Sequence, residues 1–127
     1  MAWKLVCGGT VVCQAEDQFH AAGDRRGEIY ARVGRIRGRA SVVSVDQTLS
    51  LVAEQLREPV VNEDAKLRLW CLAVKGYVEL NSNSASAKRD WSEALQIAGS
   101  LHETQWEARA QGELGIIAFL EAIWHPQ

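Results

Sequence analysis

The sequence has few prolines, no long apolar run and no strong excess of either charge. Only Pro59 and Pro126 interrupt its 127 residues, so nearly all of the backbone is free to be helical. No stretch approaches the roughly 18 consecutive apolar residues that a membrane-spanning helix needs. The net charge of −2 gives no overall attraction to nucleic acid or to anionic membranes. With 47% hydrophobic residues, one globular domain is expected.

Cysteine is also scarce. Cys7, Cys13 and Cys71 are odd in number and show no CxxC spacing, which is typical of free thiols in a reducing compartment. A secretory leader is not favoured, because Gly8 and Gly9 interrupt a short apolar stretch and no A-x-A-like cleavage site follows. We therefore predict a cytoplasmic protein with an irregular segment over residues 1–13.

Motifs for catalysis and for metal binding are missing as well. His20, His102 and His125 lie in separate segments, and none is three or four residues from another His or Cys. The sequence contains no HExxH, GxxxxGK[ST] or GxSxG pattern. We expect a protein that is not an enzyme and that uses no cofactor or metal.

What the sequence does contain is helical periodicity. Apolar residues recur at spacings of four and then three, which place them on one face of a helix. The β-branched segment 41–45 has no partner strand nearby, so it is interpreted as a linker. The predicted helices span about 14–22, 25–39, 46–57, 62–80, 85–101 and 104–122, and residues 123–127 form a tail.

Capping residues support these boundaries. Ser44 with Gln47, and Thr104 with Glu107, have the spacing of a capping box, in which side chains satisfy the free N–H groups of a first turn. Asn62 is a suitable N-cap for the fourth helix. The polar run over 81–84 predicts a turn before the fifth helix.

A glycine repeats along the chain at a spacing of helical repeats. Gly34, Gly76 and Gly115 lie 42 and 39 residues apart, each with a small residue three positions earlier. A period of roughly 34 to 47 residues in helical sequence is typical of stacked helix pairs. The repeat is clearest in the second half of the chain, and its glycines are interpreted as positions where helices approach closely.

The second half resembles the tetratricopeptide family. Ala87, Trp91 and Ala94 match the Ala-x3-Phe-x2-Ala spacing of that family's second helix, and Leu114-Gly115 resembles the Leu-Gly of its first. The resemblance implies an all-α fold of antiparallel helix pairs, stacked as a right-handed solenoid of about six helices. It also implies that aromatic and small residues pack between the repeats; these are Gly34, Gly76, Trp91, Ala94 and Gly115.

The match is that of a divergent array. The tyrosine expected three residues after Leu-Gly is Ala118, the expected tryptophan is Gln111, and the closing proline is missing. The stretch from Trp106 to Glu121 also resembles helical sensor regions that precede output domains in bacterial signalling proteins such as diguanylate cyclases, although no GGDEF-type motif is present.

These resemblances imply a scaffold or regulatory module that binds a peptide or protein on its concave face. The residues expected on that face lie near the repeat glycines and are Arg35, Lys75, Tyr77, Gln111 and Glu113. The last helix has no partner helix after it in this sequence, so we expect exposed apolar surface there. Pairing with another chain, including a second copy, and continuation into a longer repeat protein are both open.

Nucleic-acid binding is the alternative function. Six arginines lie between Asp24 and Arg39 and face only Asp24 and Glu28. Arginine binds phosphate well, so this helix could contact DNA or RNA. A solvated helix face with ion pairs explains the same residues, and the acidic net charge favours that explanation.

Overall fold

The computed structural model describes residues 11–124 and contains seven helices and no strand in that range. This confirms that the described part of the chain is all-helical. None of these helices is long and apolar enough to cross a membrane. The helices are α2 (Val11–Ala21), α3 (Arg25–Gly38), α4 (Val45–Leu56), α5 (Pro59–Glu63), α6 (Ala65–Glu79), α7 (Ser84–Ser100) and α8 (Thr104–Trp124).

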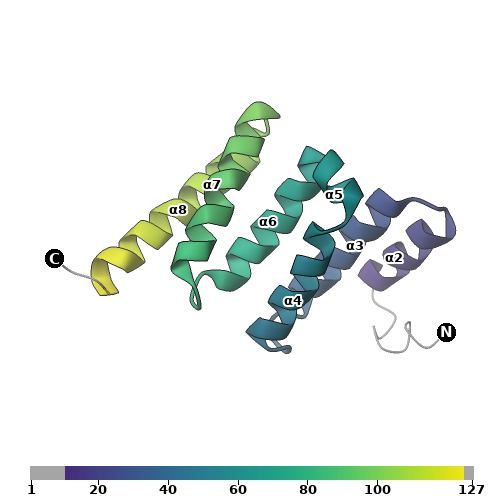
Figure 1. Cartoon of the computed structure of the whole chain (residues 1–127), viewed down its shortest axis with the longest axis horizontal. Coiled ribbons are helices and arrows are strands. Elements are labelled where there is room, and N and C mark those ends of the chain that lie inside the picture. The colour runs from purple at the N-terminus through teal and green to yellow at the C-terminus, as the bar shows by residue number, and fades with distance from the viewer. Residues whose placement is uncertain (1–10, 125–127) are drawn as a thin grey trace.

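The helices form an extended row in which α2 and α8 lie at opposite ends (Figure 1). Neighbours along the chain pack on one another: α2 on α3, α3 on α4, α6 on α7 and α7 on α8. The short α5 lets α4 pack directly on α6, and α3 also contacts α6. As a result α6 lies in the middle of the row, with helices on both sides of it.

Two predicted helices begin at residues other than those predicted. Helix α2 begins at Val11, so the segment predicted to be irregular is already helical at residues 11–13, and residues 1–10 lie outside the described residues. The helix predicted to start at Asn62 is divided into α5 and α6. Pro59 begins α5 because its fixed φ suits a first helical turn. Asp64 is then extended, and its carboxylate accepts a hydrogen bond from the Leu67 N–H, so Asp64 and not Asn62 is the N-cap.

The predicted cap at Ser44 is confirmed, because its hydroxyl accepts a hydrogen bond from the Gln47 N–H at 3.1 Å. Asn83 lies in the predicted polar turn and caps α7, a role that was not predicted for it. Thr104 is the first residue of α8 and not its cap, because the Glu107 N–H bonds to the Glu103 carbonyl. Helix α8 also runs two residues past its predicted end.

The hydrophobic core has two parts that share α6. The first part joins α3, α4, α5 and one side of α6; the second joins the other side of α6 to α7 and α8. Burial on both sides explains why α6 has eight buried residues, more than any other helix of the described range. The first part contains Ile29, Val33, Ile36, Val52, Val61, Leu67, Cys71 and Val74. The second contains Leu69, Leu72, Ala73, Ala87, Trp91, Ala94, Ala98, Ala110 and Ile117.

The repeat glycines do not share one role. A Cβ at Gly76 would lie 2.6 Å from the Trp91 indole nitrogen, so only glycine allows this close approach of α6 and α7. Trp91 is 1% exposed, and its N–H has no hydrogen-bond partner in the described structure. Ala94 is fully buried beside it. A Cβ at Gly115 would meet nothing within 4 Å, so the expected close packing there is wrong. Gly34 lies half-buried within α3.

Candidate functional site

A small pocket of aromatic and arginine side chains lies where α3, α6, α7 and α8 meet. We call it the aromatic–arginine pocket, and its volume is about 110 Å³. Its rings come from three helices and its two guanidinium groups from the outer two, α3 and α8. Such a combination of apolar walls and a few converging polar groups is typical of binding sites. The pocket is lined by Arg37, Trp70, Ala73, Val74, Tyr77, Trp91, Trp106 and Arg109.

The aromatic walls of the pocket are held by packing and by one hydrogen bond. Trp70 and Trp106 meet edge to face, with ring centroids 6.1 Å apart and an interplanar angle of 63°. The Trp70 N–H donates to the Tyr30 carbonyl at 3.3 Å, which ties the ring to α3. Edge-to-face pairs add roughly 0.5–1.5 kcal/mol beyond the area they bury. These walls are therefore set before any ligand enters.

Each arginine of the pocket lies over a ring. The Arg37 guanidinium carbon is 5.2 Å from the centroid of Tyr77, and that of Arg109 is 5.9 Å from the centroid of Trp91. Both distances are within the ~6 Å range of cation–π attraction. Arg109 also donates to Glu113 at 3.1 Å, one turn further along α8. The two cations are thus directed to the pocket by contacts within the fold.

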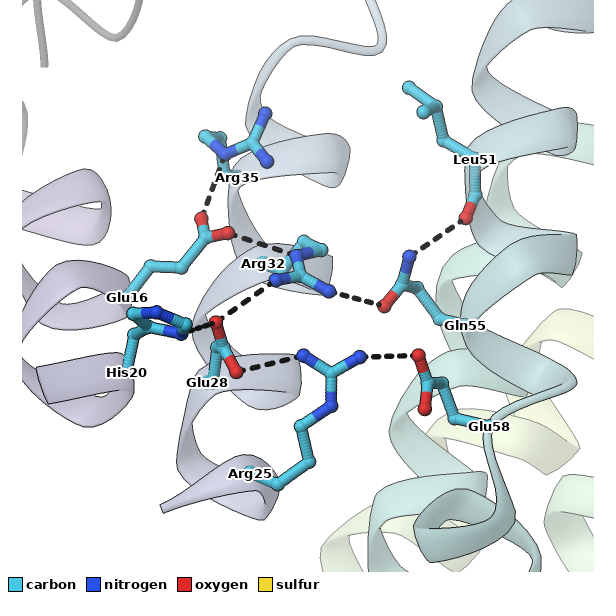
Figure 2. Close-up of polar contacts among 9 residues, drawn as sticks. All are labelled: Glu16, His20, Arg25, Glu28, Arg32, Arg35, Leu51, Gln55 and Glu58. Atoms are coloured by element: carbon cyan, nitrogen blue, oxygen red, sulfur yellow. Dashed lines mark hydrogen bonds and ion pairs between the residues drawn. The ribbon is translucent and has the colours of Figure 1, made fainter. Parts of the chain in front are cut away.

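Three other arginines of α3, Arg25, Arg32 and Arg35, take part in an ion network that joins α3 to α2 and α4, shown in Figure 2. Glu16 on α2 is buried and accepts hydrogen bonds from Arg32 at 2.9 Å and from Arg35 at 3.0 Å. Arg32 also donates to Gln55 of α4 at 3.2 Å. One guanidinium therefore connects three helices.

Glu28 is the second buried acceptor of this α3 ion network. It contacts His20 at 2.8 Å, Arg25 at 2.8 Å and Arg32 at 3.2 Å (Figure 2). Burial alone would raise the pKa of Glu28, but the hydrogen bonds from Arg25 and His20 and the charge of Arg32 outweigh it and lower the pKa. Arg25 also pairs with Glu58, beyond the end of α4.

These ion pairs bear on whether the arginines of α3 are free to bind a ligand. Arg25, Arg26, Arg32 and Arg35 each have a carboxylate partner, that of Arg26 being Asp64 at 3.2 Å. Arg37 has no carboxylate partner within residues 11–124 and packs only over Tyr77. The solvated face with ion pairs therefore describes these four arginines, whereas the side chain of Arg37 contacts a ring and no carboxylate within residues 11–124.

A second polar cluster lies between α6 and α7. Lys75 donates to Asp90 at 2.9 Å, to Glu79 at 3.2 Å and to Ser86 at 3.3 Å, while the Ser86 hydroxyl donates to Glu79 at 2.7 Å. Burial, and hydrogen bonding to the neighbouring Glu79, raise the pKa of Asp90 to about 7. The two carboxyl groups share one cation, so one of them binds a proton more readily than an exposed acid would. We call these residues the α6–α7 polar cluster.

The predicted binding residues are distributed over these three features. Tyr77 lines the aromatic–arginine pocket, and Glu113 holds Arg109 at its rim. Arg35 belongs to the α3 ion network and Lys75 to the α6–α7 polar cluster, so both have partners inside the protein. Gln111 is exposed on α8, away from the pocket lining.

Sequence reasoning missed Arg37, Trp70, Trp106 and Arg109 as possible ligand contacts. The tryptophans were assigned to packing, which they also provide. The sequence did contain a signal for part of this pocket. Gly34, Gly76 and Gly115 recur at spacings of 42 and 39 residues and lie on α3, α6 and α8, so residues near these glycines occupy equivalent positions in the repeat. Tyr77 and Arg37 are both within three residues of such a glycine.

A second pocket has fewer charged and aromatic side chains in its lining. It is larger, with a volume of about 310 Å³, and lies between the turn at 81–84 and the end of α8, and among residues 11–124 its one charged lining residue is Glu121. The outward side of α8 nearby is apolar, as expected from the sequence. Its exposed large side chains are Ile116, Phe119, Ile123 and Trp124, with 45%, 65%, 52% and 74% exposure.

Comparisons with protein-family models, with curated proteins and with solved structures found no significant match. The function proposed below therefore rests on the geometry of the aromatic–arginine pocket and on the surfaces around it.

Proposed function

We propose that this protein is a non-catalytic interaction module that binds a peptide or protein segment at the aromatic–arginine pocket. The observation that supports this most is the convergence of Trp70, Tyr77 and Trp106 with Arg37 and Arg109 from helices far apart in the sequence. Aromatic residues and arginine are the residue types that contribute most to protein–protein binding energy. The row of helices presents them on a surface that needs little rearrangement.

The size of the pocket supports a side chain as its occupant. A volume of about 110 Å³ is several times the ~30 Å³ share of one water in the liquid. It is well below the roughly 300–1,000 Å³ of pockets that enclose a drug-sized ligand. We therefore propose that one side chain or chain end enters the pocket while the rest of the partner lies across α3, α6 and α8.

The α6–α7 polar cluster supports the non-catalytic assignment. A serine beside a lysine and two carboxyl groups contains the residue types of a nucleophilic site. Ser86 is buried, however, and its proton is directed to Glu79. Lys75 is held by three partners. We therefore assign this cluster to the packing of α6 on α7.

Selection from a random peptide library displayed on phage tests the proposal. Peptides enriched on the protein should bind it with measurable affinity, and Tyr77→Ala should weaken that binding about tenfold or more, since a good aromatic contact contributes ~1.4 kcal/mol or above. Val42→Ala is the matched control, because Val42 is exposed and lies outside the pocket. Selected peptides that bind both variants equally would contradict the proposed site.

The nucleic-acid alternative has less support. Its premise was a free arginine face over Arg25–Arg39, and four of those arginines are paired with carboxylates. Retention on DNA or RNA at low salt, lost when Arg32, Arg35 and Arg37 become alanine, would favour it.

Stacking as a right-handed tetratricopeptide-like solenoid, a role in bacterial signalling and a cytoplasmic location remain part of this proposal. We also propose that the outward side of α8 contributes a second contact, since exposed apolar groups gather there. Self-association through that side predicts a concentration-dependent dimer in sedimentation, abolished by Phe119→Ser. A monomer at all concentrations would rule out pairing with a second copy.

A further inference from the structure

We infer that the aromatic–arginine pocket recognises a carboxylate group of the bound segment, with Arg37 and Arg109 as its ligands. The inference rests on the function proposed above and specifies the chemistry of the partner. A side-chain carboxylate of Asp or Glu and the carboxylate at a chain end would both provide this group.

Arg37 is the first reason for a carboxylate. It is exposed, it has no carboxylate partner within residues 11–124, and the Tyr77 ring holds its guanidinium at the pocket. The neighbouring arginines on α3 show what is missing, because Arg32 and Arg35 each bind a carboxylate oxygen at about 3 Å. A guanidinium has five N–H donors in a planar fork that matches a carboxylate.

Arg109 is the second reason. Its contact with Glu113 uses one N–H of the guanidinium at 3.1 Å, and the group also lies over the Trp91 ring. Other donors of the fork therefore remain for a ligand. The Arg109–Glu113 pair fixes where the guanidinium lies, so that little side-chain entropy is lost when a ligand binds.

Charge balance favours a monoanion. Arg37 and Arg109 contribute two positive charges and Glu113 one negative charge, so the groups at the pocket carry a net charge of +1. A carboxylate neutralises this charge. A phosphate monoester carries about −1.5 to −2 at pH 7 and would leave an excess of negative charge near Glu113.

Titration of the full chain with short peptides, followed by NMR of its indole and arginine side-chain N–H signals, tests this inference. The probes are acetyl-Ala-Glu-Ala-amide, its Gln counterpart, acetyl-Ala-Gln-Ala with a free C-terminal carboxylate, and a phosphoserine counterpart. We expect saturable shifts at Trp70, Trp106 and Arg37 with one or both carboxylate peptides, and binding about tenfold weaker for the neutral Gln amide. The carboxylate peptide that binds more tightly identifies the source of the group.

Variants give the second arm of the test. Arg37→Gln should weaken binding of the better carboxylate peptide about tenfold or more. The fold should survive, because the Arg37 side chain makes no hydrogen bond or ion pair within residues 11–124 and contacts the Tyr77 ring instead. Arg89→Gln is the matched control, since Arg89 is exposed on α7 and outside the pocket. Its binding should equal that of the unmodified protein.

The failures are distinguishable. Binding of the neutral Gln amide at the pocket as tight as that of the better carboxylate peptide, or tighter binding of phosphoserine, would overturn the carboxylate assignment and leave the interaction module intact. Library-selected peptides that bind without shifting any pocket signal would overturn the proposed site itself.

Discussion

The two ends of the helix row are held together by different chemistry. Helices α2, α3 and α4 meet at charged hydrogen bonds centred on Glu16, Glu28 and Arg32 (Figure 2). Helices α6, α7 and α8 meet around Trp91, which is packed among alanines and against Gly76. Close packing of an aromatic on small residues depends on shape, whereas the ion network depends on charge. The aromatic–arginine pocket has its rings at the end where geometry is fixed by shape, and α3 adds Arg37 to it.

The polar groups of the two ends also differ in charge balance. In the α3 ion network each buried carboxylate has at least two cationic or donor partners, and the pKa of Glu28 is lowered. In the α6–α7 polar cluster two carboxyl groups share Lys75, and the pKa of Asp90 is raised. Lowering the pH therefore weakens the contribution of Glu28 to stability and strengthens that of Asp90. Variants at each end separate the two effects.

The largest effect is expected at Trp91. Trp91→Ala removes a side chain that is 1% exposed and leaves a cavity between α6, α7 and α8. We expect the free energy of unfolding to fall by about 3–5 kcal/mol, measured by urea denaturation. Trp124→Ala is the control, because Trp124 is 74% exposed and should change stability little. A loss below ~1 kcal/mol at Trp91 would show that packing does not dominate this end.

Glu28→Gln tests the opposite end. Each hydrogen bond to a charged group contributes roughly 1.5–3 kcal/mol, and we expect a total loss in that range at pH 7 because Arg25 is partly exposed. The folded pKa of Glu28 lies below its ordinary 4.5, so its contribution is present above pH 4.5 and lost as pH falls through the folded pKa. Denaturation of both proteins over pH 3–7 should show the difference shrinking below pH ~4.5. A difference independent of pH would contradict the ionic account.

Gly76→Ala and Gly115→Ala compare two glycines that look alike in sequence. A Cβ at Gly76 would press on Trp91 at 2.6 Å, so we expect a loss of about 1–3 kcal/mol. At Gly115 the Cβ meets open space, and alanine is the better helix former by up to ~1 kcal/mol. Opposite signs in thermal denaturation support the structure, and equal losses at both positions would mean that Gly115 is packed after all.

Asp90→Asn should give the smallest change, and one that depends on pH. The pKa of Asp90 is raised from 3.8 to about 7, so protonation of this carboxyl group stabilises the folded state. Stability from this group is complete below pH ~3.8 and lost as pH rises through ~7. Asn resembles the protonated acid, so the variant should be more stable than the natural protein by about 1–2 kcal/mol at pH 8 and show no gain at pH 4. Loss of stability at pH 8 would mean that the Asp90 charge is needed beside Lys75.

Local sequence signals explain most of the helices but only part of the site. Ser44 was predicted as a cap because its side chain acts within three residues. Asp64 was missed, because Asn62 is also a good cap and only the short turn after Pro59 decides between them.

Contacts between distant residues were harder to predict. The pairing of Gly76 with Trp91 followed from the repeat, whereas Gly115 has the same sequence signal but no helix over it. The sequence around Arg32 has an excess of positive charge. The structure neutralises part of that charge with Glu16, which lies on another helix. Charge patterns along one segment cannot show which segment will neutralise them, and the aromatic–arginine pocket depends on such long-range placement.

The central claim is that partners bind at the aromatic–arginine pocket. Its most direct test is NMR chemical-shift mapping of the full chain with a library-selected peptide. We expect the largest chemical-shift changes at residues that line the pocket, which are Arg37, Trp70, Tyr77, Trp106 and Arg109. Largest shifts on the outward side of α8, or on α2 and α4, would contradict it.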